Sequence, residues 1–448
     1  MSSRRILIIG GSTRAAADSV RRAGWQPICA DYFADLDLKA TAEVIPVSNY
    51  PDSIPDDVAH VHADGWFYCG AIENRPDIVE RMSSPIARYG PLLGTPAKTL
   101  RLVRNPLWLC ETLRATGIDM LDVRDSTNVP PSDGHWIQKP LSSAGGRSIR
   151  NWNQTARESD LTEPCYFQER APGIALSALF DFHEATARWL GASRELTTTD
   201  FIQPTREQHP VAPPPKIWQA PSEFSYVGSC GPLELLNVTS DGWHAPNGWH
   251  ALVRAWSSTS SPSPRHSNHS ILRDQNSPFQ TIQSQANRIA AALAAAAPQL
   301  KGIVGLDFRF DGHTTWLTEV NPRYTASVEV IELARGQSLL NPYTEPLPNH
   351  SRHQIVAKRI LYASTALKVP DLSHYQTERQ PWDIPAIADI PQPGLTIEPG
   401  WPICTVMASG PDEPTVQRTI TEQINHIAYD LERTKGPAVP IARGGRPR

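Results

Sequence analysis

Four residues in the segment 302–332 are of types that bind metal ions or anions: Asp307, Glu319, Asn321 and Arg323. Two carboxylates and an amide oxygen form a set of hard oxygen ligands, which suits Mg²⁺. Pro322 ends the strand, because it has no N–H to donate. Arg323 follows it as a fixed cation beside the metal. The pattern therefore predicts a magnesium site with a guanidinium at its edge. The alternative is that the acids are solvated on an exposed hairpin, as most acids are.

A β-hairpin has to bring these residues together. Alternating apolar and polar residues on both sides of an Asp-Gly turn predict two antiparallel strands. We expect Asp311 to pair with Thr315 across a three-residue loop, which places Asp307 directly opposite Glu319. Asn321 lies two residues beyond Glu319 and therefore shares its face of the sheet.

A second group of residues has the composition of a phosphate-binding loop. The stretch 136–140 reads as a short strand that carries a lysine, and a run rich in Gly and Ser follows it. Small residues let backbone N–H groups approach phosphate oxygens closely, and the lysine adds a point charge. The expected phosphate contacts are Lys139, Ser142, Ser143, Gly145 and Gly146. Taken alone, such a run is more often an ordinary turn, so this prediction depends on the acidic hairpin downstream.

Residues 5–31 predict a strand, a helix and a second strand, with Gly10-Gly11 at the first turn. Asp31 lies where an acid would meet the ribose of a dinucleotide, so an NAD-dependent oxidoreductase is one alternative. The turn lacks the GxGxxG pattern, which argues against it. Ser12, Thr13 and Arg14, at the start of the helix, are instead candidate contacts for an anion. Glu73 lies in a loop that follows a strand. Such loops lie at the carboxyl ends of parallel strands, where substrates bind, so Glu73 is a candidate substrate contact.

Two further motifs are weaker. His60-Val-His62 has the spacing of strand-borne metal ligands, but no second cluster of ligands follows it. Ser229 and Cys230 invite a nucleophile interpretation, but they lack the GxSxG frame and an assignable His–acid pair. Neither motif predicts a site.

Composition excludes several classes of protein. The 448 residues suffice for about three domains, and a net charge of −4 provides no basic field for nucleic acid. The six cysteines show no CxxC spacing, which fits a reducing compartment and argues against a disulfide framework and a zinc site. No apolar run approaches the roughly 20 residues needed to span a bilayer. We therefore predict a soluble, cytoplasmic protein without a nucleic-acid or membrane partner.

The run Glu319-Val-Asn321-Pro-Arg323, with Asp307 upstream across a turn, resembles the metal-binding hairpin of the ATP-grasp superfamily. Lys139 and the Gly/Ser run resemble the superfamily's lysine and glycine-rich lid. The resemblance covers nearly the whole chain and is to the carboligase or carboxylate–amine ligase type related to biotin carboxylase. It implies an α/β + α+β fold class: a Rossmann-like pre-ATP-grasp domain, a two-subdomain ATP-grasp fold and a small β-rich C-terminal domain.

The resemblance also implies the domain boundaries. The pre-ATP-grasp domain would span 1–95, the ATP-grasp domain 96–345 and the C-terminal domain 346–434. Residues 238–278 are rich in Ser, Pro, Trp and His and cannot bury a core, which predicts a disordered insert. The tail 435–448 is predicted to be disordered as well.

The implied cofactors are ATP and Mg²⁺ or Mn²⁺. Asp307, Glu319 and Asn321 would hold the metal, and Arg323 would be catalytic by balancing charge on the transferred phosphoryl group. The segment 166–173 resembles the hinge strand that reads adenine through backbone groups. Its expected ATP contacts are Gln168, Glu169, Arg170 and Ala171.

The implied function is an ATP-dependent ligase that activates a small-molecule carboxylate as an acyl phosphate, which an amine or similar nucleophile attacks. The alternatives are a bicarbonate-dependent carboxylase, a non-catalytic ATP-binding module and the NAD-dependent oxidoreductase. Two departures from the superfamily keep the binding module open: Pro106 replaces a common phosphate-binding lysine, and Ala175 replaces a common ribose-binding acid. Either Arg104 substitutes for that lysine or the site has one cation fewer. The sequence does not identify the substrates, and it leaves open whether the protein forms a homodimer.

Overall fold

The structure is a computed structural model, and it describes residues 3–84, 88–142, 145–153, 164–197, 225–236, 238–239, 242–243, 277–344, 347 and 354–433. The predicted insert therefore lies almost wholly outside the described residues, and so does the predicted tail. Within the described part, no helix is both long enough and apolar enough to cross a membrane.

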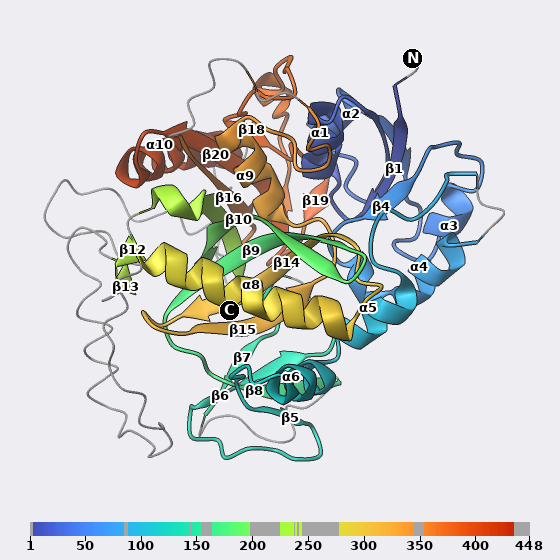
Figure 1. The fold of residues 1–448 in the computed structure, drawn as a ribbon. Coiled ribbons are helices and arrows are strands. Elements are labelled where there is room, and N and C mark those ends of the chain that lie inside the picture. The colour runs from blue at the N-terminus through green and yellow to red at the C-terminus, as the bar shows by residue number, and fades with distance from the viewer. Residues whose placement is uncertain are drawn as a thin grey trace, which may run out of the picture.

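The N-terminal part is a four-stranded parallel sheet in the order β3-β2-β1-β4, drawn in blue in Figure 1. Its strands are β1 (Arg5–Gly10), β2 (Gln26–Asp31), β3 (Glu43–Pro46) and β4 (Trp66–Tyr68). Its helices are α1 (Arg14–Arg22), α2 (Leu36–Lys39), α3 (Ile54–Asp57) and α4 (Pro76–Met82). The apolar run 6–9 in β1 is fully buried, as a parallel strand covered on both faces requires.

The centre of the molecule is an eight-stranded antiparallel sheet in the order β15-β14-β9-β10-β11-β16-β20-β18. Its strands are β9 (Ile174–His183), β10 (Thr186–Thr197), β11 (Tyr226–Gly231), β14 (Gly302–Phe310), β15 (Thr315–Asn321), β16 (Ile355–Tyr362), β18 (Ile387–Ala388) and β20 (Pro402–Gly410). The helices on it are α8 (Pro278–Ala296), α9 (Ala326–Arg335) and α10 (Glu413–Arg433).

The two faces of the central sheet differ in character. On one face, alternate apolar residues such as Leu176 and Phe308 pack against α8 and α10 in the largest hydrophobic core. The opposite face carries α9, whose Ser327 hydroxyl lies 2.9 Å from that of Ser193 on β10. Because side chains alternate along a strand, Asp307 and Ser177 also lie on this second face. The candidate chemistry is therefore on the polar face of the sheet.

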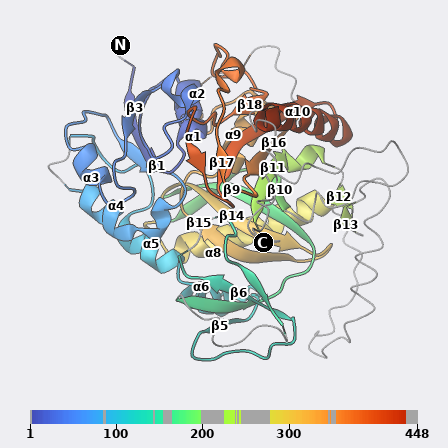
Figure 2. The ribbon, with the colours of Figure 1, turned by 180° about the vertical axis from the view of Figure 1, so that it is seen from behind.

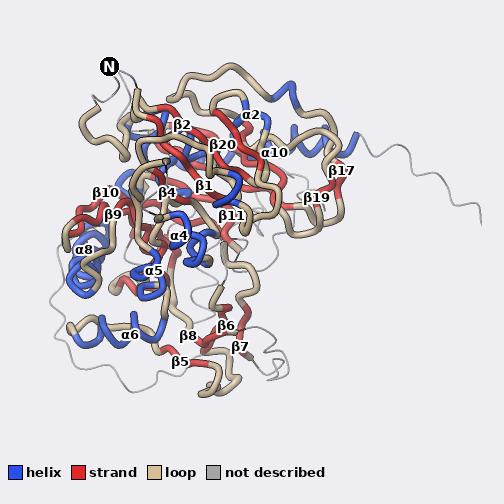
Figure 3. Tube along the Cα trace, turned by 90° about the vertical axis from the view of Figure 1, so that its right-hand side faces the viewer, coloured by secondary structure: helices blue, strands red, loops and turns tan. Residues whose placement is uncertain are grey.

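A smaller antiparallel sheet, in the order β5-β8-β6-β7, lies below the central sheet in Figures 1, 2 and 3. Its strands are β5 (Val123–Asp125), β6 (Trp136–Pro140), β7 (Arg150–Trp152) and β8 (Cys165–Glu169). Helices α5 (Ala97–Val103) and α6 (Pro106–Ala115) connect it to the N-terminal part. The Asn105 side chain caps α6 by accepting from the two backbone N–H groups of Leu107 and Trp108, and Pro106 occupies the first helical position.

The C-terminal strands mostly extend the central sheet, since β16, β20 and β18 form its far edge. Two short strands, β17 (Leu367–Lys368) and β19 (Thr396–Ile397), pair separately, as do β12 (Val238–Thr239) and β13 (Gly242–Trp243). The predicted fold class is confirmed.

A buried network of ion pairs joins the N-terminal part to the centre. Arg14 of α1 binds Glu329 of α9 and also Asp389, with its Nε 3.0 Å from Oδ1 of the aspartate. Lys358 of β16 places its Nζ 2.9 Å from Oε2 of Glu329. Burial alone would raise the pKa of Glu329, but the charges of Arg14 and Lys358 outweigh burial and hold that pKa well below its usual range. Glu329 is thus the acidic partner of Lys358 and shares Arg14 with Asp389.

Replacing Glu329 with Gln should therefore lower the free energy of unfolding by about 3–5 kcal/mol, because the buried Lys358 would lose its ion-pair partner and Arg14 would lose one of its acidic partners. Denaturant unfolding measures this loss. The native contribution is present above the ordinary glutamate pKa of about 4.3 and declines only as the pH falls toward the lowered value. Glu184→Gln is the control, since the Glu184 side chain is 86% exposed. Equal stabilities of the two variants would contradict a structural role for Glu329.

Candidate active site

The two acids of the hairpin face each other as predicted, but the residues near the turn pair in a different register. Asp307 of β14 lies directly opposite Glu319 of β15. The expected pair between Asp311 and Thr315 is wrong, because Phe310 pairs with Thr315. A β-bulge next to Asp307 makes up the missing residue and returns the two acids to facing positions.

Thr318, the extra residue of the bulge, also contacts the small sheet. The Thr318 carbonyl oxygen accepts from Lys139 Nζ at 3.3 Å and from Gln168 Nε2 at 3.4 Å. Because β15 is the edge strand of the central sheet, backbone groups that point away from β14 are available to the small sheet. The irregularity of β15 is thus the place where the small sheet is tied to the central sheet.

Asp307 is held by two side chains of the polar face. The Ser177 hydroxyl donates to Oδ1 at 2.9 Å, and the Asn321 amide donates to Oδ2 at 2.6 Å. Burial and then the facing charge of Glu319 raise the pKa of Asp307 to about 7. The two carboxylates repel each other, so their ionised forms require nearby positive charge.

Three cations surround Glu319 and supply part of that charge. Burial alone would raise the pKa of Glu319, but Arg104, Lys139 and Arg323 outweigh it and lower the pKa. Arg104, at the end of α5, makes a direct ion pair with Glu319, and its Nη2 donates to Asn74 at 3.1 Å. Arg104 therefore supplies a positive charge two residues before Pro106, which carries none.

The donor set fits a divalent cation that prefers oxygen. Asp307 and Glu319 are half-buried carboxylates on facing positions, and Asn321 is two residues further along the same strand. The Asn321 Oδ1 atom accepts from Arg323 Nη2 at 3.2 Å, so this oxygen points toward the charged cluster. Among the described residues, no group of three or more His, Cys, Asp or Glu could hold a metal. The candidate metal ligands are thus this mixed set of two acids and one amide.

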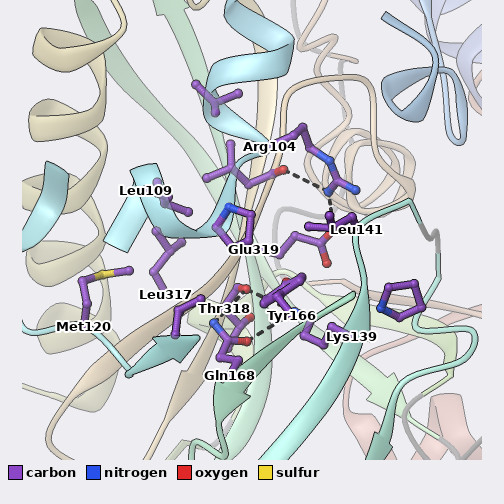
Figure 4. Close-up of a pocket in the computed structure, with 15 residues that line it drawn as sticks. Arg104, Leu109, Met120, Lys139, Leu141, Tyr166, Gln168, Leu317, Thr318 and Glu319 are labelled. Carbon is purple, nitrogen blue, oxygen red and sulfur yellow. Dashed lines mark hydrogen bonds and ion pairs between the residues drawn. The ribbon is translucent and has the colours of Figure 1, made fainter. Parts of the chain in front are cut away.

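A pocket lies between the two antiparallel sheets, beside the acids, and contains about 510 Å³ of empty space, part of it open to solvent. Figure 4 shows Lys139, Gln168, Thr318 and Glu319 converging on it. The Lys139 ammonium is buried and lies 3.3 Å from the Gln168 Oε1 atom. Arg104 and Tyr166 line it as well, and the remaining lining side chains are apolar, among them Val103, Leu109, Met120, Val123 and Leu317. A pocket with apolar walls and a few convergent polar groups is the usual form of a small-molecule site.

Arg323 and Glu73, predicted independently, meet in an ion pair. The Arg323 Nε atom lies 2.7 Å from Oε1 of Glu73, whose side chain is 1% exposed. A Cβ at Gly70 would lie 3.8 Å from the Arg323 guanidinium carbon, so a small residue there gives the guanidinium room. This pair joins the acidic hairpin to the loop at the carboxyl end of β4.

The glycine-rich loop extends from the small sheet toward the far side of the central sheet. Ser142 and Gly145 are exposed, Gly146 is half-buried, and Ser143 lies outside the described residues. Both glycines have positive φ angles, +64° and +71°, which only glycine adopts without strain. The Gly145 carbonyl accepts from the backbone N–H of Tyr226 at 3.0 Å, which ties the loop to β11.

Only one of the four predicted hinge residues lines the pocket. Gln168 is buried there, whereas Glu169 is exposed and accepts from the backbone N–H of Asp122 at 3.2 Å. The Arg170 backbone N–H donates to His135, and Ala171 follows in the loop after β8.

Two of the three predicted contacts at the start of α1 are engaged elsewhere. Thr13 is fully buried and donates through its hydroxyl to Asp31 at 2.7 Å, and Arg14 is committed to the buried ion network. Ser12 is exposed. Asp31 also accepts from two backbone N–H groups, of Thr13 and Ala34, so its carboxylate organises the turn. Such an engaged carboxylate is poorly suited to bind a ribose.

Sequence reasoning missed one acid of the site, Glu195 of β10. It follows Ser193 on the same face by two residues and pairs with Ser229 of β11. Burial and then the charge of Asp307 raise its pKa well above the ordinary value, whereas Arg309 lowers it. Glu195 stands in an alternating strand among other polar residues, so the sequence alone offers no signal that separates it from a solvated acid.

Comparisons with known proteins complete the description. No protein-family profile matches the sequence. An uncharacterized protein of Methanocaldococcus jannaschii is 30% identical over 115 residues, which are 25% of this chain and 27% of that relative. The match thus spans about a quarter of the curated relative.

Similarity to solved structures extends over nearly the whole chain. Carboxyaminoimidazole ribonucleotide synthase from Aspergillus clavatus, complexed with ATP, has a TM-score of 0.57 at 14% identity and covers 95% of this chain and 99% of its own. The chain has the ATP-grasp fold. L-amino acid ligase from Bacillus licheniformis has a TM-score of 0.57 at 11% identity, covering 95% and 98%. Biotin carboxylase from Campylobacter jejuni has a TM-score of 0.55 at 13% identity, covering 97% of both chains. In this ATP-grasp fold, the pocket lies between the two antiparallel sheets, and the acidic hairpin forms the edge of the central sheet beside it.

The repulsion within the acid pair can be tested directly. Replacing Glu319 with Gln should lower the pKa of Asp307 from about 7 toward its ordinary value near 3.9, because the variant removes the facing negative charge. Carboxyl ¹³C NMR titration of labelled aspartate measures the change, with Glu184→Gln as the control. An unchanged Asp307 titration in the Glu319 variant would show that the two carboxylates do not interact.

Proposed function

We propose that the chain is an ATP- and Mg²⁺-dependent ligase that activates a small-molecule carboxylate for attack by an amine or a similar nucleophile. The observation that carries the proposal is one convergence of charge beside one pocket. Two facing carboxylates on the central sheet meet Lys139 from the small sheet, Arg104 from α5 and Arg323 from the loop after β15. A carbon–nitrogen bond is the product that this proposal favours.

The chemistry runs in two steps. A substrate carboxylate oxygen attacks the terminal phosphorus of ATP, so that an acyl phosphate forms and ADP leaves. The nitrogen of the second substrate then attacks the acyl carbon, inorganic phosphate leaves, and the nitrogen loses a proton. Charge accumulates on the transferred phosphoryl group in the first step, and fixed cations placed around it lower that barrier.

The acid pair and the amide would hold the metal. Asp307, Glu319 and Asn321 supply oxygen ligands of the type that Mg²⁺ takes, and the bound ion would neutralise phosphate charge. It would also offset the repulsion that raises the pKa of Asp307. The chain's own ion pair between Arg104 and Glu319 has to rearrange or share its carboxylate when the ion binds.

The nucleotide would lie in the pocket between the sheets. Leu109, Met120 and Leu317 provide apolar contact for a planar base. Lys139 would contact the phosphates from β6, and the backbone N–H groups at Gly145 and Gly146 would cover them. Arg104 would replace the phosphate-binding lysine that is absent at Pro106, since it is the cation nearest in sequence to the start of that helix.

Arg323 stands between the metal hairpin and the N-terminal part. Its ion pair with Glu73 fixes the guanidinium at the side of the site that faces the carboxyl ends of β1 and β4. The carboxylate substrate would enter from there, so Arg323 would meet the oxygens of the transferred phosphoryl group and of the acyl phosphate.

ADP release across a panel of carboxylic acids and amines tests the proposed function. The proposal expects release that requires an acid, an amine and Mg²⁺ together. Release that requires bicarbonate and no other acid would identify a carboxylase instead. ATP binding without release for any pair would indicate a binding module, and saturable binding of a nicotinamide dinucleotide would favour the oxidoreductase.

Lys139→Ala should weaken the binding of ATP with Mg²⁺ by at least about tenfold, or 1.4 kcal/mol, because it removes a buried charge next to the phosphates. Isothermal calorimetry measures the affinity, and the melting temperature shows whether the fold is intact. Lys368→Ala is the control, since Lys368 is an exposed lysine of β17. Unchanged ATP affinity in the Lys139 variant would contradict the phosphate contact.

Arg323→Lys keeps the charge and removes the planar fork of donors. We expect kcat to fall by roughly 10²–10³, while ATP affinity changes by less than about tenfold. Steady-state kinetics and calorimetry give the two quantities, with Arg288→Lys as the exposed control. A variant that loses ATP binding but keeps its turnover at saturating ATP would make Arg323 a ground-state ligand.

A further inference from the structure

Four aromatic side chains form a continuous row beside the carboxyl ends of the N-terminal strands. Tyr32 and Phe33 follow β2, Tyr50 lies in the loop after β3, and Trp401 precedes β20. Ring centroids are 5.3 Å apart for Tyr32–Tyr50, 5.2 Å for Tyr32–Phe33 and 6.3 Å for Phe33–Trp401. We call Tyr32, Phe33, Tyr50 and Trp401 the aromatic rim. Three separate segments of the chain contribute to it.

One end of the aromatic rim adjoins the charged pair of the candidate site. A Cβ at Gly11 would lie 3.6 Å from the Tyr50 Oη atom, so this hydroxyl lies over the first βα turn. Burial and then the charge of Glu73 raise the pKa of Tyr50, and Arg323 acts in the opposite direction. Tyr50 Oη is buried and has no hydrogen-bond partner among the described residues. An unpaired buried hydroxyl beside a charged pair is suited to bind a polar group of a ligand.

The other end of the aromatic rim lies beneath the glycine-rich loop. The Arg147 guanidinium carbon is 5.4 Å from the Trp401 ring centroid, which is the geometry of a cation–π contact. The same loop is tied to β11 through Gly145 and Tyr226. The aromatic rim therefore runs from the Glu73–Arg323 pair to the loop proposed to cover the phosphates.

The aromatic rim leaves large aromatic surface in contact with solvent. The Tyr32 side chain is 45% exposed and Trp401 is 37% exposed, and both are among the most exposed large hydrophobic residues of the described chain. Aromatic faces bind planar apolar groups by stacking or edge contacts, each worth about twofold to tenfold in affinity. A cation is a less suitable occupant, because Arg147 already lies on Trp401.

We propose that the aromatic rim is the specificity subsite of the carboxylate substrate, and that the substrate carries an aromatic ring. The carboxylate would lie toward Arg323, the ring would stack along Tyr32 and Trp401, and the Tyr50 hydroxyl would bind a polar substituent near the carboxylate. This assignment rests on the proposed function for the position of the carboxylate. It adds a substrate class to that function: small aromatic carboxylic acids.

Binding of two carboxylates of similar length, 3-phenylpropanoate and hexanoate, tests the assignment without relying on turnover. Saturation-transfer NMR and calorimetry on the full chain, with Mg²⁺ and a non-hydrolysable ATP analogue, give the affinities. We expect 3-phenylpropanoate to bind more tightly than hexanoate. Trp401→Ala and Tyr32→Ala should each weaken the aromatic acid by about threefold to tenfold and leave hexanoate nearly unaffected. Trp401→Phe, which keeps a ring, should retain most of the affinity.

Tyr343→Ala is the matched control, because Tyr343 is an aromatic residue that is 93% exposed and lies outside the aromatic rim. Equal binding of the two acids to the wild-type chain would overturn the assignment, and so would unchanged affinity for the aromatic acid in Trp401→Ala. Competition of the aromatic acid by tetramethylammonium would show a cation site instead and would overturn it too. Failure of the proposed function looks different: the aromatic acid would bind as expected, but ADP would not be released with any amine.

Discussion

The facing pair of Asp307 and Glu319 is the constraint on which the rest of the site depends. Two ionised carboxylates about 5 Å apart repel each other by about 3 kcal/mol at an effective dielectric constant near 20. Burial adds to this repulsion, and the pKa of Asp307 stays raised although Ser177 and Asn321 donate hydrogen bonds to it, so these bonds do not offset the two effects together. Positive charge has to be supplied, and the chain supplies it from three parts that are distant in sequence.

The sources of that charge explain the arrangement of the molecule. Arg104 comes from the helix that leaves the N-terminal part, Lys139 from the small sheet, and Arg323 from the loop after the acidic hairpin. Each cation has a second partner: Asn74, Gln168 and Glu73 respectively. The acid pair is therefore the common point of contact of the two antiparallel sheets and the N-terminal part. The network of Arg14, Glu329 and Lys358 uses the same principle on the other side of α9.

The chemistry of the hairpin could be predicted from sequence because it is local. A turn of Asp and Gly and two alternating strands place the acids on one face, and the bulge at Thr318 corrects the one-residue error in the expected register. A bulge has no reliable signal in a single sequence, since it depends on how the strand is used by its neighbours.

The long-range contacts could not be predicted in the same way. Arg14 follows a glycine-rich turn, as an anion-binding residue would, but it is bound by acids more than 300 positions away in the chain. Glu195 is one acid in an alternating strand, and only the sheet order brings it close enough, across β9, for the charge of Asp307 to raise its pKa. The aromatic rim likewise joins segments from both ends of the chain, so spacing gave no indication of it.

We infer that the acid pair binds a divalent ion together with the nucleotide. Calorimetric titration of a non-hydrolysable ATP analogue, with and without Mg²⁺, on the wild-type chain and on Asp307→Asn tests it most directly. Mg²⁺ should tighten nucleotide binding to the wild-type chain by at least about tenfold, and this gain should be lost in Asp307→Asn. Nucleotide binding that is equally tight without Mg²⁺, or a gain from Mg²⁺ that survives the substitution, would contradict it.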